Sequence, residues 1–547
     1  MANSLISLGV GLLSLAQQRL GELYAGTVPE VEKSRRLNDG GLQEAEKCCL
    51  EGLAMHRKLL GKENVKVARA LNILAQVRLT QYNLAEAETL QRESLAMYKK
   101  LLGSENARVA KLTQQIAFML AFREDRLAEA ETMNREAVAI QKKLLGEDHP
   151  DVARSLFNLA TLLRREGKWA EAETEYREGV TMWSRMRAGD SFEPASALQY
   201  LSEVLLHQGK LADSETQRRA EFEMLTRLYG NTNANVVESL AWLADVLLRE
   251  GKLEEAEARA REALASSKKL SGDGGGSITA MIDPIDALVN VLLAQHKEME
   301  ADQLLGDLLI QTPEGHPLRV CLFRVRSSFF ARCRRWKDAI ADLSNVIELA
   351  PLDDNAAFQL AVLVLEIGDR ETYRAHCQKM VARFRATNLP GPLGETAEAC
   401  LLVAEPGPDS EVAGQLADQA FSLGKNSFWV YYVQFVKGLA EYRAGHFASA
   451  VDWVDKCIGQ PTMVSGPRPD GPAYLVQAMA QHKLKRSDEA RAALAKAADI
   501  VNAKLLKVQD TALDENWIDW LIAEILLREA QALIDPPAAT PKEKRTR

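Results

Sequence analysis

Residues able to carry out chemistry are few in this sequence. Gly274-Gly275-Gly276-Ser277 is the nearest approach to a phosphate-binding loop, but it lacks the lysine that contacts the phosphates in such a loop. The sequence has no GxSxG turn around a nucleophilic serine, no HExxH zinc motif and no HRD or DFG motif of a kinase. An enzyme would need a buried polar cluster in their place, and none is evident. The chain is therefore predicted to be non-catalytic and to use no cofactor, and the glycine run is interpreted as a linker.

Cysteine and histidine, the usual ligands of zinc, are spread singly along the chain. The seven cysteines include no CxxC pair and form no Cys/His cluster at zinc-ligand spacing. Cys48 and Cys49 are sequence neighbours, and such neighbours do not easily form a disulfide. The pattern predicts no metal site and a set of reduced thiols, as in a cytoplasmic protein.

Paired carboxylates recur, and such pairs can act as a general acid and a general base. The tripeptide Glu-Ala-Glu, or Asp-Ser-Glu in its place, occurs at intervals of 42 or 43 residues, at Glu44–Glu46, Glu86–Glu88, Glu129–Glu131, Glu171–Glu173, Asp213–Glu215 and Glu255–Glu257. Because these carboxylates recur in every unit and have Arg or Lys nearby, we expect a solvated helix face with i,i+4 ion pairs rather than an active site.

A second marker keeps the same interval. It is a residue pair that ends in glycine, at Leu60-Gly61, Leu102-Gly103, Leu145-Gly146, Tyr229-Gly230 and Ser271-Gly272. Two markers in phase over this length predict a stacked array of similar supersecondary units.

One unit indicates how the repeat is built. Asp148 and Pro150 are typical of a helix start, because Asp can cap the first turn and proline fits the first helical position. Gly167 is placed to end this helix, and a second helix is expected from about Trp169 with Ala172 on its packed face. Each unit is thus predicted to be a helix–turn–helix that buries its apolar face only by stacking on its neighbours.

The repeated unit resembles a known family. Leu159-Ala160, Gly167-Lys168, Ala172 and the turn Glu147-Asp148-His149-Pro150 resemble the tetratricopeptide repeat, and the 42-residue interval resembles the repeats of kinesin light chains and their bacterial relatives. The resemblance implies an all-α fold, a right-handed α-solenoid of stacked helix–turn–helix tetratricopeptide repeats. It also implies a non-catalytic scaffold that binds a protein or peptide segment in the concave groove of the array.

The sequence predicts five segments. They are an N-terminal helix or cap (1–38), the regular 42-residue array (39–272), a glycine-rich insertion with a degenerate repeat (273–312), irregular tetratricopeptide-like repeats with a C-terminal capping helix (313–534) and a disordered tail (535–547). We expect Ser271–Ser277 to be the most mobile loop of the N-terminal half, because glycine runs lose much entropy on ordering. Leu389–Gly394 (LPGPLG) is interpreted as another loop.

The C-terminal half carries a second, less specific resemblance, to the tails of bacterial multidomain serine/threonine kinases. It implies an alternative function, the regulatory or substrate-recruiting tail of a larger signalling protein.

Composition narrows the class of partner. The net charge is −8, and an acidic balance disfavours broad nucleic-acid binding. The apolar stretch Leu5–Ala16 is too short to span a bilayer. The partner is therefore predicted to be a protein or peptide rather than nucleic acid or membrane, and the location to be cytoplasmic.

The resemblance also implies where the partner binds, because the first helix of each unit lines the concave side in this repeat class. Positions i, i+4 and i+7 share one helix face. The first of these positions changes along the array from Arg69, Lys111 and Arg154 to Ser196 and Glu238, which predicts a basic start that takes an acidic segment. The predicted binding residues are Arg69, Lys111, Gln115, Arg154, Asn158 and, as apolar anchors, Tyr200 and Trp242.

Overall fold

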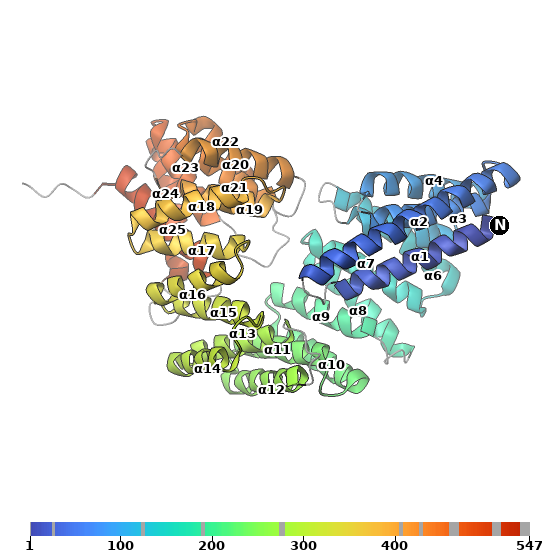
Figure 1. Ribbon diagram of the computed structural model, residues 1–547, viewed down its shortest axis with the longest axis horizontal. Coiled ribbons are helices and arrows are strands. Elements are labelled where there is room, and N and C mark those ends of the chain that lie inside the picture. Colours follow the sequence, from blue (N-terminus) through green and yellow to red (C-terminus); the bar gives the residue numbers. More distant parts are fainter. Residues whose placement is uncertain are drawn as a thin grey trace, which may run out of the picture. The chain divides into compact units, whose positions relative to one another are not determined.

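The computed structural model describes residues 2–23, 28–81, 83–121, 126–186, 192–272, 279–403, 409–425, 430–458, 470–505 and 516–536. Within these ranges the chain forms 25 helices and no strand (Figure 1). Within each of the two compact units described below, successive helices pack in pairs and each pair packs against the next, so the predicted all-α solenoid is confirmed.

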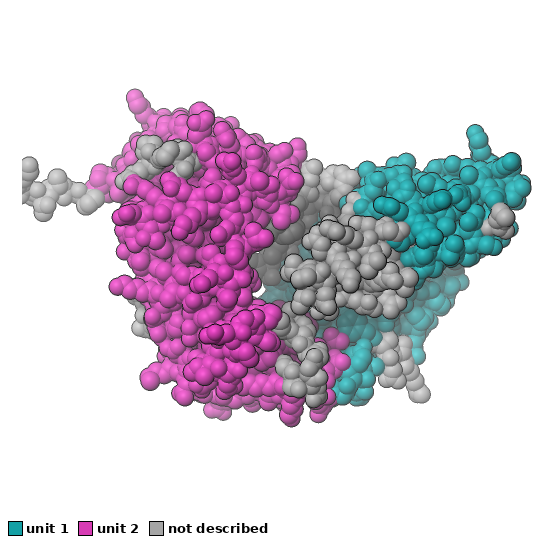
Figure 2. Space-filling model, in the orientation of Figure 1, with its two compact units in different colours: residues 1–230 teal, residues 231–547 magenta. Residues whose placement is uncertain are grey.

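The chain divides into two compact units, residues 1–230 and 231–547, which Figure 2 shows in different colours. Unit 1 contains α1 (Ala2–Leu23), α2 (Val28–Leu60), α3 (Val65–Thr80), α4 (Leu84–Leu102), α5 (Ala107–Leu120), α6 (Leu127–Leu145), α7 (Pro150–Arg165), α8 (Trp169–Arg185), α9 (Phe192–His207) and α10 (Leu211–Tyr229). The odd-numbered helix of each pair is called the first helix here, and the even-numbered one the second helix.

Unit 2 continues with the same alternation. It contains α11 (Ala234–Arg249), α12 (Leu253–Gly272), α13 (Thr279–Ala294), α14 (Glu298–Gln311), α15 (Leu318–Arg332), α16 (Trp336–Leu349), α17 (Asp354–Glu366), α18 (Arg370–Phe384), α19 (Pro390–Leu401), α20 (Asp409–Gly424), α21 (Val430–Arg443), α22 (Phe447–Cys457), α23 (Asp470–Lys483), α24 (Ser487–Leu505) and α25 (Trp517–Ile534).

The central alanine of the Glu-Ala-Glu tripeptide is a packing position. Ala87, Ala130, Ala172 and Ala256 all have no exposed surface, although the carboxylates on either side of them face solvent to varying degrees. The prediction that these alanines occupy equivalent packed sites is confirmed. A small side chain at this point allows two helices to approach closely.

The turn inside each unit uses a residue with positive φ. Gly167 and Gly251 have φ of 72° and 78°, and in both turns the glycine N–H bonds to a carbonyl of the preceding helix. His296, Arg334 and Lys485 occupy the same turn in later units with φ of 57° to 63°. These three side chains therefore adopt a left-handed backbone conformation that glycine adopts more easily.

Two predicted loops have different outcomes. Leu389–Gly394 is not a loop, because α19 begins at Pro390, and proline is compatible with the first turn of a helix since no N–H is needed there. Ser271 and Gly272 end α12, whereas the rest of the predicted mobile loop, residues 273–277, lies outside the described residues. The predicted tail also lies outside them from residue 537 onward.

Candidate binding surface

The first helices of unit 1 lie side by side and are joined by their side chains. The Asn72 side chain on α3 donates a hydrogen bond to Gln115 on α5, with 3.3 Å between Nδ2 and Oε1. Gln114 on α5 donates to the hydroxyl of Ser155 on α7 at 2.8 Å. Arg164 on α7 lies 2.6 Å from Glu203 on α9. We call the solvent-facing side of α3, α5, α7 and α9 the first-helix surface of unit 1.

The starts of α3, α5 and α7 are fixed by capping side chains. Asn64 accepts a hydrogen bond from the backbone N–H of Lys66, and Asn106 accepts one from that of Arg108. His149 Nδ1 accepts from the N–H of Asp151 in the same way, and Pro150 occupies the first turn of that helix. These caps align the helices in register, so the residues five positions after each cap, Arg69, Lys111 and Arg154, occupy equivalent places.

Charge is distributed unevenly over the first-helix surface. The helix α3 carries three basic residues and no carboxylate, and α5 carries two basic residues and no carboxylate. Four of these cations project from the first turns and are exposed: Lys66, Arg69, Arg108 and Lys111. We call these four residues the basic face. The helix α9, by contrast, carries Glu193 and Glu203 and no lysine or arginine.

The basic face affects the titration of groups beneath it. Burial lowers the pKa of His56, and the neighbouring Lys66 cation lowers it further. Burial raises the pKa of Tyr98, whereas the cations of Arg108 and Arg69 act in the opposite direction. Both shifts show that the cations of the basic face lie close enough to His56 and Tyr98 to change their pKa values.

The predicted cations differ in their environment. Arg154 is half-exposed and lies 3.4 Å from Asp151 and 3.3 Å from Glu193, so two carboxylates already neutralise part of its charge. Arg69 and Lys111 have no ion-pair partner among the described residues. The positive charge of the surface is therefore concentrated on α3 and α5 rather than spread to α7.

Tyr200, one of the predicted apolar anchors, is partly covered by side chains of neighbouring helices. Its ring lies 5.7 Å from that of Phe157 and 6.3 Å from that of Tyr176, measured between ring centroids, and the Arg164 guanidinium lies 5.0 Å from its centroid. Tyr200 is accordingly half-buried. From α9 it contacts α7 and α8 and contributes to holding the three helices together.

The remaining predicted residues are placed as follows. Gln115 is bonded to Asn72, and Asn158 is half-buried on α7. The residue of α3 equivalent to Gln115 is Ile73, which is apolar and buried. The polar side chains Gln115 and Asn158 therefore have no polar counterpart at the equivalent position of α3. Trp242 is 41% exposed and lies on α11, in unit 2.

The Glu-Ala-Glu carboxylates form ion pairs within and between repeats. Glu131 lies 2.8 Å from Arg135 on its own helix, as the i,i+4 prediction requires, and 2.6 Å from Lys168 at the start of the next second helix. Arg135 also lies 2.7 Å from Glu171 of the next repeat. The pairs between repeats were not predicted, although the cations recur 37 to 40 residues after each glutamate.

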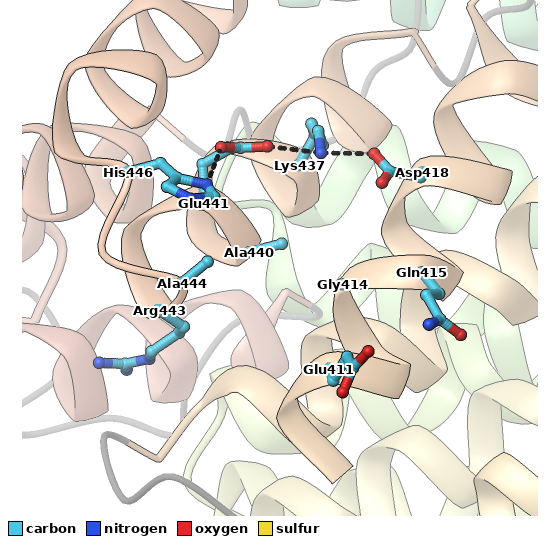
Figure 3. A pocket seen from close by; sticks show the side chains of 10 residues that line it. All are labelled: Glu411, Gly414, Gln415, Asp418, Lys437, Ala440, Glu441, Arg443, Ala444 and His446. Atoms are coloured by element: carbon cyan, nitrogen blue, oxygen red, sulfur yellow. Dashed lines mark hydrogen bonds and ion pairs between the residues drawn. The ribbon is translucent and has the colours of Figure 1, made fainter.

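A pocket of about 440 Å³ lies in unit 2 between α20 and α21 (Figure 3). Four of its residues form a row of polar contacts: Lys437 contacts Asp418 and lies 2.6 Å from Glu441, which lies 2.9 Å from His446. Arg443, which also lines the pocket, pairs with Glu529 of α25. Gly414, Ala440 and Ala444 also line it. In the part of the chain that the structure describes, no group of three or more His, Cys, Asp or Glu side chains could hold a metal ion.

The described helices were also compared with the dimensions of a lipid bilayer. None of them combines the length and the apolar composition needed to cross one.

Comparison with known proteins identifies the repeats. Residues 36–100, 108–185 and 193–269 match the family model described as tetratricopeptide repeat. No curated protein matches the chain.

Three solved structures illustrate the structural similarities. The repeats of a kinesin light chain described as putative, from Podosopora anserina, are 19% identical, with 38% of this chain and 98% of that chain covered and a TM-score of 0.35. Their Q17M form is also 19% identical, with 40% and 94% covered and a TM-score of 0.33. BtubC (BKLC) from P. vanneervenii is 18% identical, with 47% and 95% covered and a TM-score of 0.33. The match to the family model, together with the helix pairs in phase with it, shows that the N-terminal part of this chain, from residue 36 to residue 269, is built of tetratricopeptide repeats.

Proposed function

We propose that the chain is a non-catalytic scaffold and that the first-helix surface of unit 1 binds an acidic segment of a protein partner. Tetratricopeptide repeats generally mediate protein–protein interaction through extended surfaces of this kind. The observation that carries the proposal is the charge of α3 and α5, which together hold five basic residues and no carboxylate.

The position of the cations favours an acidic ligand. Lys66, Arg69, Arg108 and Lys111 all lie within the first five residues of their helices, close to the unpaired backbone N–H groups and the positive end of the helix dipole. A carboxylate that approaches this end of the helices is attracted by both contributions. The effect is strongest at low ionic strength, because the Debye length falls to about 10 Å at 0.1 M salt.

The opposite end of the same surface sets the direction of the ligand. Glu193 on α9 already attracts Arg154, and Glu203 attracts Arg164. An acidic segment is therefore repelled from α9 and attracted to α3 and α5. Phe118, which is 58% exposed near the end of α5, offers an apolar contact two helical turns beyond Lys111.

The test uses fluorescence anisotropy with a labelled twelve-residue peptide rich in Glu and Asp, and a matched peptide in which Gln and Asn replace them. We expect the wild-type chain to bind the acidic peptide, and the double variant R69E/K111E to bind it at least tenfold more weakly. The control K268E/K269E makes the same change in net charge on exposed residues of α12 in unit 2, and it should retain most of the binding.

Stability separates a local effect from unfolding. Arg69 and Lys111 are exposed and have no ion-pair partner among the residues described, so R69E/K111E should keep the helicity and melting temperature of the wild type. Equal binding of the acidic and the amide peptide by the wild type would contradict the proposal. So would unchanged binding of the acidic peptide by R69E/K111E in low salt.

A further inference from the structure

The last helix of the chain packs against a helix distant in sequence. The helix α25 packs against α23 and α24, its neighbours along the chain, and also against α17, which lies more than 150 residues earlier (Figure 1). A helix that only covered the last repeat would contact α23 and α24. The additional contact places α25 on the first-helix side of the C-terminal repeats.

Polar contacts connect α25 to α17 and to one further first helix, α21. Arg443 at the end of α21 binds both oxygens of Glu529, and the distance from Nη2 to Oε2 is 2.7 Å. Arg528 pairs with Glu366 at the end of α17. Arg443 also donates to the carbonyl of Leu401 at 2.8 Å, a contact that orients it without α25.

The helix α25 is amphipathic, and its apolar side is the side that is buried. The buried positions follow the helical repeat along one side and are Trp517, Leu521, Ile522, Ala523, Leu526, Leu527, Ala530 and Ile534. The other side exposes Arg528 and Gln531 to solvent. This is the pattern of an amphipathic helix bound in an apolar groove.

The charged groups of α25 add little to its docking apart from Glu529. Glu524 lies near the carboxylate of Glu366, but the cations of Arg334 and Arg528 offset that repulsion. The docked state is therefore held mainly by the apolar stripe and by the pair of Glu529 with Arg443.

We infer that α25 is an intramolecular ligand, and that the surface of α17, α21 and α23 beneath it is a docking site for an amphipathic helix of a partner protein. The partner helix that fits has an apolar stripe like that of α25 and a carboxylate placed to meet Arg443. Because α25 belongs to the same chain as the docking site, its local concentration there is on the order of millimolar. A partner must compete with that concentration, so the docking site is inhibited in cis. The inference concerns unit 2 and does not depend on the acidic-segment proposal for unit 1.

The competing interpretation is that α25 is a permanent part of the core. Hydrogen exchange of the full wild-type chain distinguishes the two. If α25 detaches, its amides should exchange at least tenfold faster than those of α23, because local opening exposes one without the other. If α25 and α23 exchange at the same rate, the inference is wrong.

A peptide experiment tests the docking site itself. A fluorescein-labelled peptide of residues 516–536 is added to the full chain and to the full-length variant I522D/L526D, whose own α25 has lost its apolar stripe. We expect the peptide to bind the variant at least tenfold more tightly than the wild type. A peptide carrying E529R should bind the variant at least tenfold more weakly than the native peptide, because it would face Arg443 with a like charge.

Each other outcome decides against the inference. A variant that keeps the wild-type circular dichroism spectrum but does not bind the peptide shows that no docking site exists under α25. A variant that loses its helicity shows that α25 is a fixed part of the core.

Discussion

The Lys297 ammonium lies 2.8 Å from the carboxylate of Glu257, and this ion pair joins two successive helix pairs of unit 2. The same carboxylate lies 2.7 Å from Arg261 on its own helix. Glu131 and Glu173 make equivalent contacts in unit 1, to Lys168 and Lys210. The third residue of the Glu-Ala-Glu tripeptide therefore connects each repeat to the next.

The first prediction concerns Glu257 and pH. The hydrogen bond from Lys297 lowers the pKa of the Glu257 carboxyl, and the hydrogen bond from Arg261 lowers it further. Burial acts in the opposite direction, and the resulting pKa is about 2. Its contribution to stability is thus present above about pH 4.5 and is lost as the pH falls towards about 2. We expect Glu257→Gln to destabilise the chain by roughly 1 kcal/mol at pH 7, a value reduced because both cations are partly exposed.

The measurement is urea unfolding of both chains between pH 2 and pH 7. The difference between E257Q and the wild type should shrink towards zero at the acid end, where the wild-type carboxylate is also protonated. Glu314→Gln, at an exposed loop position, serves as the control. A difference that stays constant over the whole pH range would show that the ion pair is not its source.

The second prediction concerns the alanine between the two carboxylates. Ala130 has no exposed surface, whereas Ala128 on the same helix is exposed. Ala130→Leu should destabilise the chain by about 1–3 kcal/mol, because the added methyl groups must displace packed neighbours. Ala128→Leu should change stability by less than about 0.5 kcal/mol, as surface substitutions generally do. Thermal melts of the two variants give the comparison, and equal melting temperatures would refute the packing role.

The third prediction concerns the turns that lack glycine. The backbone N–H groups of His296 and Lys297 donate hydrogen bonds to the carbonyls of Leu293 and Leu292. In the preceding repeat, Gly251 and Lys252 donate to the equivalent carbonyls, those of Leu248 and Leu247. His296 nevertheless has a φ of 57°. His296→Gly should therefore stabilise the chain by roughly 0.5–1 kcal/mol, since a side chain in this conformation costs about 1–2 kcal/mol and the flexibility of glycine in the unfolded chain offsets part of the gain.

The reverse substitution provides the matched control. Gly251→Ala places a Cβ at a φ of 78° and should lower the stability. Its surroundings are open, with no atom within 4 Å of an added Cβ, so any loss comes from the backbone conformation and not from a clash. If both substitutions shifted the urea midpoint in the same direction, the turn argument would fail.

The repeats were predictable from the sequence because their signals are local. The phase of the Glu-Ala-Glu tripeptide identified Ala87, Ala130, Ala172 and Ala256 as equivalent packed positions, and all four are fully buried. The helix start at Pro150 was predicted correctly, but the side chain that caps it is His149 rather than the expected Asp148. The capping atoms are separated by fewer than five residues, so a start of this kind can be located from the sequence alone.

Contacts between repeats were less accessible to the same reasoning. The i,i+4 pair of Glu131 and Arg135 follows from helix geometry alone, but the pair of Glu131 and Lys168 depends on how two helix pairs stack. Tyr200 was predicted as an anchor because it lies on the face of its first helix that lines the concave side in this repeat class. Stacking places Phe157 and Tyr176 against it. The position of α25 against α17 depends on contacts over 162 residues, for which the sequence has no periodic signal.

The last prediction concerns the buried carboxyl group that α25 covers. Glu398 is 3% exposed and accepts a hydrogen bond of 2.9 Å from the Tyr432 hydroxyl. Burial, together with the nearby Asp519, raises its pKa to about 8 although the Tyr432 hydrogen bond acts in the opposite direction. Glu395, on the same helix, has its pKa raised to about 8 by burial and by the carboxylates of Asp354, Glu398 and Asp353.

The sign of the pH effect follows from these shifts. In the unfolded chain Glu398 ionises near pH 4.5, whereas in the folded chain it holds its proton to about pH 8. Its contribution to stability is therefore complete below about pH 4.5 and is lost as the pH rises towards 8, and it amounts to roughly 2 kcal/mol over this range. Glu398→Gln keeps the acceptor for Tyr432 and removes the ionisation, so the variant should lose less stability than the wild type between pH 5 and pH 8. The pH dependence of stability that remains in E398Q is attributed to Glu395. The control Glu348→Gln, at an exposed position on α16, should show the same pH dependence as the wild type. Urea midpoints measured at four pH values give both slopes, and parallel curves for E398Q and the wild type would exclude Glu398 as a pH-sensitive group of unit 2.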